Sequence, residues 1–228
     1  SREEAVADVI RRLEEILEKN LRLLEEIIRR LLRILEHNLR LNEKAVEIIE
    51  DLIRKLLRDE KVIREAKKTV EEILRESKRV LDEVKKKLEK ILRDLERVHE
   101  KVMRDIREIL KRNKGKERAL ETLRRVVEEL VRVTEEVAER LKEVVKEVVE
   151  ANRRVLEKLK KLIEELAEKV VKSRLADDLR RVVKKIVEDL EENLERIKDI
   201  IRRLVEELER SLEEIRRLID RLVKEIRR

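Results

Sequence analysis

The 228-residue chain lacks cysteine, proline and every aromatic residue, and it has a single glycine. Without cysteine it forms neither a disulfide framework nor a thiolate metal site. With one glycine and no proline it lacks the residues that shape loops, which excludes a many-stranded sheet or a loop-rich enzyme. No apolar run approaches the roughly 20 residues that span a bilayer, and no signal peptide is visible, so we expect no membrane partner.

Charged residues dominate what is present. The chain has 63 Lys and Arg against 56 Asp and Glu, a formal net charge of +7. These residues are interleaved with aliphatic ones at helical spacing, a pattern typical of long helices or coiled coils. Acidic and basic residues are mixed throughout, and no aromatic ring is available to stack on a base, so we expect no nucleic-acid partner. The mixed charge indicates solvated helix faces.

The apolar stripe repeats every 3.6 residues and changes phase at three places. Gly115, near the midpoint, supplies one obvious turn. The stripe also shifts at residues 58–61 and 172–175, where Asp59 and Ser173 are favourable residues to cap the helix that follows. The three breaks predict four helices, over about 3–57, 60–113, 117–171 and 174–227.

The period and the short connections predict how these helices assemble. A 3.6-residue period lets helices run straight, whereas a strict 3.5-residue repeat imposes a supercoil. Short connections require antiparallel neighbours. We therefore predict an all-α fold, a single domain over residues 1–228, built as an elongated and nearly untwisted up-down-up-down four-helix bundle. Because 58–61 and 172–175 contain neither Gly nor Pro, each could instead be a kink. Two very long helices would then form a hairpin that oligomerises.

Uncharged polar residues interrupt the apolar stripe at positions that match between helices. In an antiparallel pair, residues at one height have numbers that add to a constant total, and these polar residues do so across both hairpins. They predict two layers with one member from every helix, namely Asn20, His99, Thr134 and Ser211 in the first, and Asn42 (with Asn38 as a further candidate), Ser77, Asn152 and Asn193 in the second. A buried polar group left unpaired costs a few kcal/mol. The layers are therefore predicted to fix the helix register.

Composition, period and polar layers together resemble de novo designed helical bundles of the parametric kind, which contain buried hydrogen-bond networks. The resemblance covers the whole chain. It implies a structural scaffold with no natural biochemical activity and no cofactor. It assigns no natural compartment, and we expect a soluble protein in the cytoplasm of an expression host.

The sequence offers little for catalysis or metal binding. Glu96 and His99 form one Glu-x-x-His motif, but a dimetal site needs two such motifs and two more inward Glu residues, which the stripe lacks. We expect His99 to be a neutral member of its layer, and His37 either to join the second layer or to lie at its boundary. No hydroxyl has a His-carboxylate relay. We therefore predict no catalytic, metal or cofactor-binding site and no small-molecule substrate.

One flank of the first helix widens the apolar stripe. Leu23, Ile34, Leu41 and Ile48 align there at helical spacing. In a monomer, Lys and Arg stems can cover such residues. Alternatively, the flank is a self-association stripe. The partner prediction is therefore a monomer or a homo-oligomer formed through the first helix.

Overall fold

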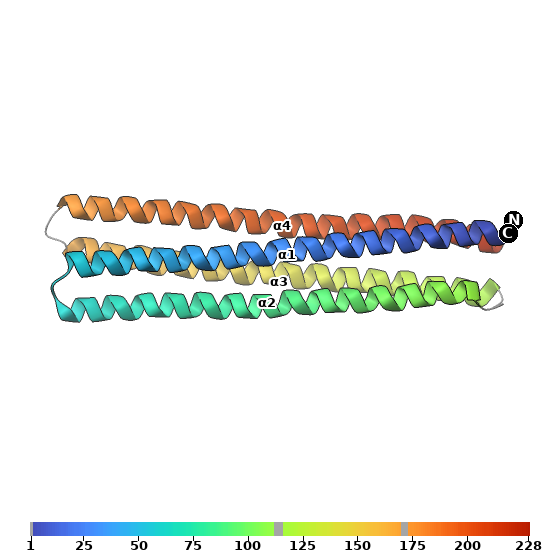
Figure 1. The fold of residues 1–228 in the computed structure, drawn as a ribbon, viewed down its shortest axis with the longest axis horizontal. Coiled ribbons are helices and arrows are strands. Elements are labelled where there is room, and N and C mark those ends of the chain that lie inside the picture. The colour runs from blue at the N-terminus through green and yellow to red at the C-terminus, as the bar shows by residue number, and fades with distance from the viewer. Residues whose placement is uncertain (1, 112–115, 170–172) are drawn as a thin grey trace. The chain divides into compact units, whose positions relative to one another are not determined.

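The computed structural model describes residues 2–111, 116–169 and 173–228, and within them it is all-α (Figure 1). Its elements are α1 (Arg2–Leu56), α2 (Glu60–Lys111), α3 (Lys116–Lys169) and α4 (Ser173–Arg227). The predicted bounds that fall on described residues agree with these to within one residue, and the predicted ends at 113 and 171 lie outside the described residues. The predicted four-helix bundle is confirmed, and the alternative of two very long helices is wrong.

The break between α1 and α2 shows why the stripe changes phase there. Residues 57–59 are not helical. The Asp59 carboxylate accepts a hydrogen bond from the Lys61 N–H at 3.0 Å, and the Asp59 carbonyl accepts one from the Ile63 N–H at 3.0 Å. Asp59 therefore caps α2, so this break is a loop. Ser173, predicted to cap α4, is its first helical residue. The predicted turn at Gly115 and residues 170–172 lie outside the described residues.

The helices themselves follow from composition. Leu, Arg, Lys and Glu are strong helix formers, and no helix contains Pro. Ion pairs between residues one turn apart add support along the exposed faces, as between Arg79 and Glu83 at 2.9 Å and between Lys55 and Asp51 at 3.0 Å.

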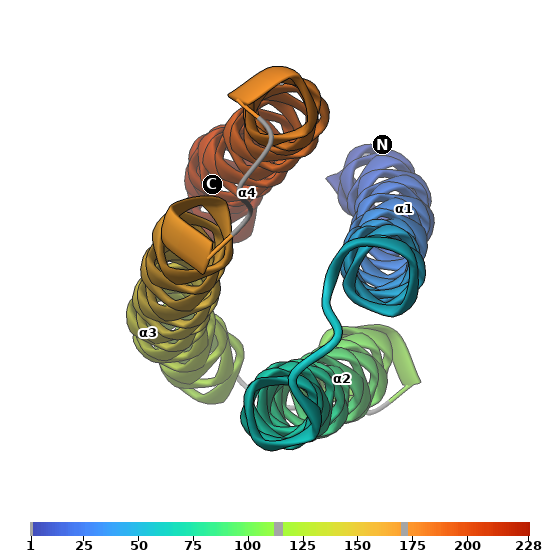
Figure 2. The ribbon, with the colours of Figure 1, turned by 90° about the vertical axis from the view of Figure 1, so that its left-hand side faces the viewer.

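The chain groups into two compact units, and each unit takes segments from all four helices. Unit 1 comprises Ser1–Arg30, Lys87–Lys142 and Ile201–Arg228, and unit 2 comprises Leu31–Lys86 and Glu143–Ile200. Within each unit the helices surround a shared core in the order α1 to α4, clockwise in Figure 2, so that α1 lies diagonally opposite α3. The single domain over residues 1–228 stays a prediction.

Each unit has its own aliphatic core with contributions from every helix. In unit 1, Leu13, Ile106, Leu123 and Leu222 have no exposed surface. In unit 2, the matching residues are Ile53, Ile73, Leu159 and Leu190, each at most 1% exposed. The cores are built from the residues of the 3.6-residue stripe, which is why the sequence pattern located them.

Candidate functional site: the two polar layers

Asn38 is the centre of the polar layer in unit 2. Its side-chain Oδ1 accepts a hydrogen bond from Asn193 Nδ2 at 3.1 Å, and its Nδ2 donates to Asn152 Oδ1 at 3.0 Å. One amide on α1 therefore links α4 to α3 through the core. Asn38 was the secondary candidate from the sequence, yet it is the residue with two asparagine partners.

Asn42 makes the connection to α2. Its Nδ2 donates to Ser77 Oγ at 3.2 Å. Asn38 and Asn42 are one turn apart on α1, so both reach the interior from the same helix face. The structure thus brings all five predicted residues of this layer together. Four of them are deeply buried, and Asn38 is half-buried.

Two atoms of the unit 2 layer are buried without a partner in the described structure. They are the acceptor Asn42 Oδ1 and the donor Asn152 Nδ2. Both residues line one cavity of about 30 Å³, together with Asn38 and Ser77. A buried unpaired polar group costs about 1–3 kcal/mol, so these atoms weaken the layer unless something completes their bonding.

The unit 1 layer has a different character. Asn20, His99, Thr134 and Ser211 line a common cavity of about 70 Å³, so the structure does bring them together. The Thr134 hydroxyl, however, donates at 2.7 Å to the carbonyl of Leu130 on its own helix. Asn20 Nδ2 and His99 Nε2 are buried without partners. Among the described residues, no hydrogen bond joins these four side chains to one another.

Burial controls the charge of His99. Removal of the ring from water lowers the pKa of His99 below its usual 6.5, while nearby Glu18 and a hydrogen bond with the Leu17 backbone oppose that shift. The lowered pKa favours the neutral ring at pH 7, the form expected from the sequence. His37 is exposed, so it lies at the boundary of the unit 2 layer and not within it.

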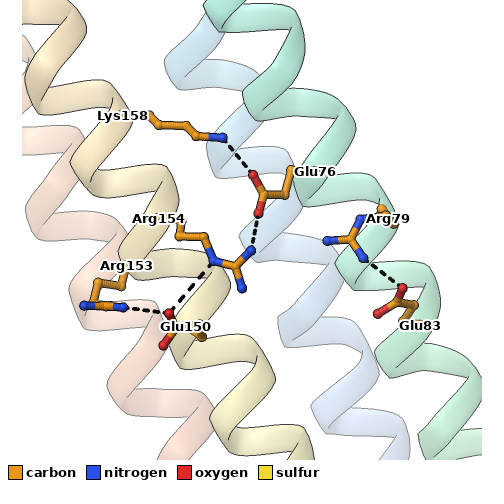
Figure 3. A network of polar contacts seen from close by, with 7 residues as sticks. All are labelled: Glu76, Arg79, Glu83, Glu150, Arg153, Arg154 and Lys158. Carbon is orange, nitrogen blue, oxygen red and sulfur yellow. Dashed lines mark hydrogen bonds and ion pairs between the residues drawn. The ribbon is translucent and has the colours of Figure 1, made fainter.

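Sequence reasoning missed the ion pairs that flank the unit 2 layer. Glu76, which precedes Ser77, is bound by Lys158 Nζ and Arg154 Nη1, each at 2.9 Å (Figure 3). Its side chain is only 15% exposed, and it also lines the unit 2 cavity. The hydrogen bond from Lys158 lowers the pKa of Glu76, and the charges of Lys158 and Arg154 add to this effect. The carboxylate therefore stays ionised beside the polar layer.

An equivalent pair in unit 1 shows which signal was overlooked. Asp94 on α2 is hydrogen-bonded by Arg140 on α3, which lowers the pKa of Asp94. Asp94 follows Glu76 by 18 residues, and Lys158 follows Arg140 by the same spacing. This 18-residue spacing, five turns of the 3.6-residue period, also separates several of the polar residues. Applied to charged residues, it would have identified both ion pairs.

The predicted association stripe is not a strongly exposed surface. Leu23, Ile34, Leu41 and Ile48 are all half-buried. Leu41 packs against the unit 2 core. Among the side chains that the structure describes, Val182 is the exposed large aliphatic residue, at 37%.

The described residues contain no cluster of three or more His, Cys, Asp or Glu side chains that could hold a metal ion. No helix in the described part of the chain is both long enough and apolar enough to cross a membrane. No protein-family model, curated protein or solved structure matches this chain.

Proposed function

We propose that the chain is a structural scaffold of the kind that designed helical bundles represent, in which buried polar layers hold the helices in one register. The observation that carries this proposal is the hydrogen-bonded series Asn193–Asn38–Asn152, which links three helices inside one unit. Apart from His99, the polar side chains of the layers are amides and hydroxyls, which do not gain or lose a proton near pH 7. The proposal therefore includes no enzymatic activity.

The physical basis is a difference between the aliphatic side chains of the core, whose contacts have no direction, and its amide side chains, whose hydrogen bonds do. A slide of one helix by a turn moves its side chains by about 5.4 Å. Leu, Ile and Val can repack after such a shift, because their contacts have no direction. The amide hydrogen bonds cannot, because they need donor and acceptor within about 3.2 Å. The hydrogen-bonded layer of unit 2 therefore penalises other registers.

The interhelical ion pairs support the same register independently. Glu76 with Lys158 in unit 2 and Asp94 with Arg140 in unit 1 have residue numbers with the same total. In an antiparallel pair of helices, contacts whose two residue numbers add to the same total belong to one alignment of the helices. The two ion pairs therefore indicate the same alignment of α2 with α3 in each unit.

Solution mass combined with small-angle scattering tests the scaffold role. Concentration is measured by refractive index, since the chain has no aromatic absorbance. We expect a mass of 27.7 kDa and a maximum dimension near 80 Å, the length of a helix of about 54 residues. A multiple of that mass would contradict the monomeric scaffold.

A multiple would instead support a second function, a subunit of a symmetric homo-oligomer. The aligned, half-buried residues Leu23 and Ile34 on α1 favour this alternative. The Leu23→Glu/Ile34→Glu variant separates the two cases. If the flank is an interface, the variant reduces the mass to that of one chain; in a monomeric scaffold, the mass is the same before and after the substitutions.

A further inference from the structure

We propose that unit 2 binds one water molecule, which accepts a hydrogen bond from Asn152 Nδ2 and donates one to Asn42 Oδ1. These two atoms are buried and lack protein partners, and their residues line the same cavity. The inference goes beyond the scaffold role, because it concerns a ligand of the layer and holds whatever the protein is for.

The chemistry of the cavity selects water over other ligands. An orphaned donor and an orphaned acceptor belong to two residues that line this cavity, and water is the smallest molecule that can satisfy both at once. The cavity has a volume of about 30 Å³, above the roughly 10–15 Å³ that a water needs and too small for most organic molecules. Both groups are neutral amides, so neither compensates the charge of an ion. Glu76, the charged residue at the cavity, is already paired with Lys158 and Arg154.

The walls of the cavity explain why such a water would be held in place. Val80, Val84, Val148 and Val155 line the cavity and offer no competing hydrogen bond. Asn42 and Asn152 are 3% and 4% exposed, so a water molecule bonded to both would be largely shielded from bulk solvent. Buried waters of this type commonly make two to four hydrogen bonds to groups that would otherwise be unpaired.

The bound water would join two separate pieces of the layer. Without it, Asn193, Asn38 and Asn152 form one hydrogen-bonded series, and Asn42 with Ser77 forms another. With it, each amide donates to the next acceptor in a single direction, from Asn193 on α4 to Ser77 on α2. Hydrogen bonds aligned head to tail strengthen one another. The water is therefore the link that brings α2 into the same network as the other three helices.

A high-resolution crystal structure of the full chain tests the site directly. We expect a solvent peak within about 2.7–3.2 Å of both Asn152 Nδ2 and Asn42 Oδ1. An empty cavity, or direct contact between the two amides, would overturn the proposal.

A solution experiment tests the same contact with matched variants. In the parent, a nuclear Overhauser cross peak should connect water with the Asn152 side-chain amide. Its sign should be the one expected for a long-lived bound molecule. Asn42→Leu removes the acceptor and fills the cavity, so the cross peak should disappear. Asn20→Leu, in the other unit, should retain it. Absence of the cross peak in the folded parent, or its survival in Asn42→Leu, would rule the water out, while the mass measurement would still report separately on the scaffold role.

Discussion

At the residue scale, Asn38 shows how an amide bonded to two other helices favours one arrangement of those helices, because other arrangements leave its partners unpaired. It is bonded on both sides, so its loss leaves Asn193 Nδ2 and Asn152 Oδ1 without partners. Asn38→Leu should therefore lower the free energy of unfolding by about 1–3 kcal/mol for each orphaned group. Chemical denaturation followed by circular dichroism measures this change.

The control for Asn38→Leu is a variant in which all three hydrogen-bonded asparagines are replaced. Asn38→Leu/Asn152→Leu/Asn193→Leu removes donors and acceptors together, so it should lose less stability than the single variant or gain some. If the triple variant is the less stable of the two, the amides contribute net stability, and our explanation of their role is wrong.

His99 makes stability depend on pH. Burial lowers its pKa below 6.5, so the unfolded chain takes up the proton more readily as the pH falls. This contribution to stability is complete above pH 6.5 and is lost as the pH falls from there through the folded-state pKa. Denaturation curves between pH 8 and pH 5 should show that loss in the parent and a smaller one in His99→Gln.

His37→Gln is the control for the histidine experiment, because His37 is exposed and lies outside the layer. It should keep the pH profile of the parent. The same decline in His99→Gln as in the parent would mean that groups other than His99 cause it.

Glu76 is held by two cations from α3, so Glu76→Gln should weaken the α2–α3 contact. Both cations are 40% or more exposed, which limits the expected loss to about 0.5–1 kcal/mol, smaller still at high salt. Glu157→Gln removes an exposed contact within α3 and should cost less. Equal effects of the two substitutions, measured by denaturation at low salt, would show that the interhelical pair adds nothing.

Most members of the polar layers could be predicted, because polar side chains are conspicuous in an aliphatic stripe. The sequence could not show which of Asn38 and Asn42 bonds to the asparagines of α3 and α4. Both residues face the interior one turn apart, and the alignment of α1 with α4 decides their partners. The orphaned atoms Asn152 Nδ2 and Asn20 Nδ2 were also beyond reach. Whether an amide completes its bonding depends on fractions of an ångström that residue spacing does not report.

At the element scale, Asp59 determines where α2 begins. Its carboxylate accepts the Lys61 N–H at 3.0 Å, so Asp59→Ala should cost about 0.5–2 kcal/mol. Asp59→Asn keeps an acceptor and should lose much less. Thermal unfolding of both variants measures the difference, and an alanine variant as stable as the parent would show that the loop needs no cap.

The helix boundaries were predictable without Gly or Pro because phase is conserved along a helix. A stripe that returns after a non-integral number of turns cannot belong to the same straight helix. This predicted a break at residues 58–61, and the non-helical residues of the structure are 57–59. The final residue of each helix was less certain, because terminal turns carry few core contacts. The predicted ends of α2 and α3, at residues 113 and 171, lie outside the described residues.

At the scale of the whole molecule, the alignment of helices was the most predictable property. Antiparallel neighbours with short connections leave few alignments. The Asn42–Ser77 hydrogen bond has the residue-number total predicted for α1 and α2, and the ion pairs between α2 and α3 have the same total in each unit. The division into two compact units was not predicted. The apolar stripe runs through both units with the same period, so the sequence does not indicate where one compact unit ends and the other begins.

The central claim is that the buried amides set the helix register, and a distance measurement within unit 2 tests it most directly. The chain has no cysteine, so Lys44→Cys on α1 and Lys160→Cys on α3, both at exposed positions, can carry a pair of spin labels. The parent should give a single narrow distance. In the background of Asn38→Leu/Asn152→Leu/Asn193→Leu the distribution should broaden or gain a population displaced by about one turn, roughly 5 Å along the helix. An identical narrow distribution in both proteins would contradict the claim and assign the register to the loops, the aliphatic core and the interhelical ion pairs.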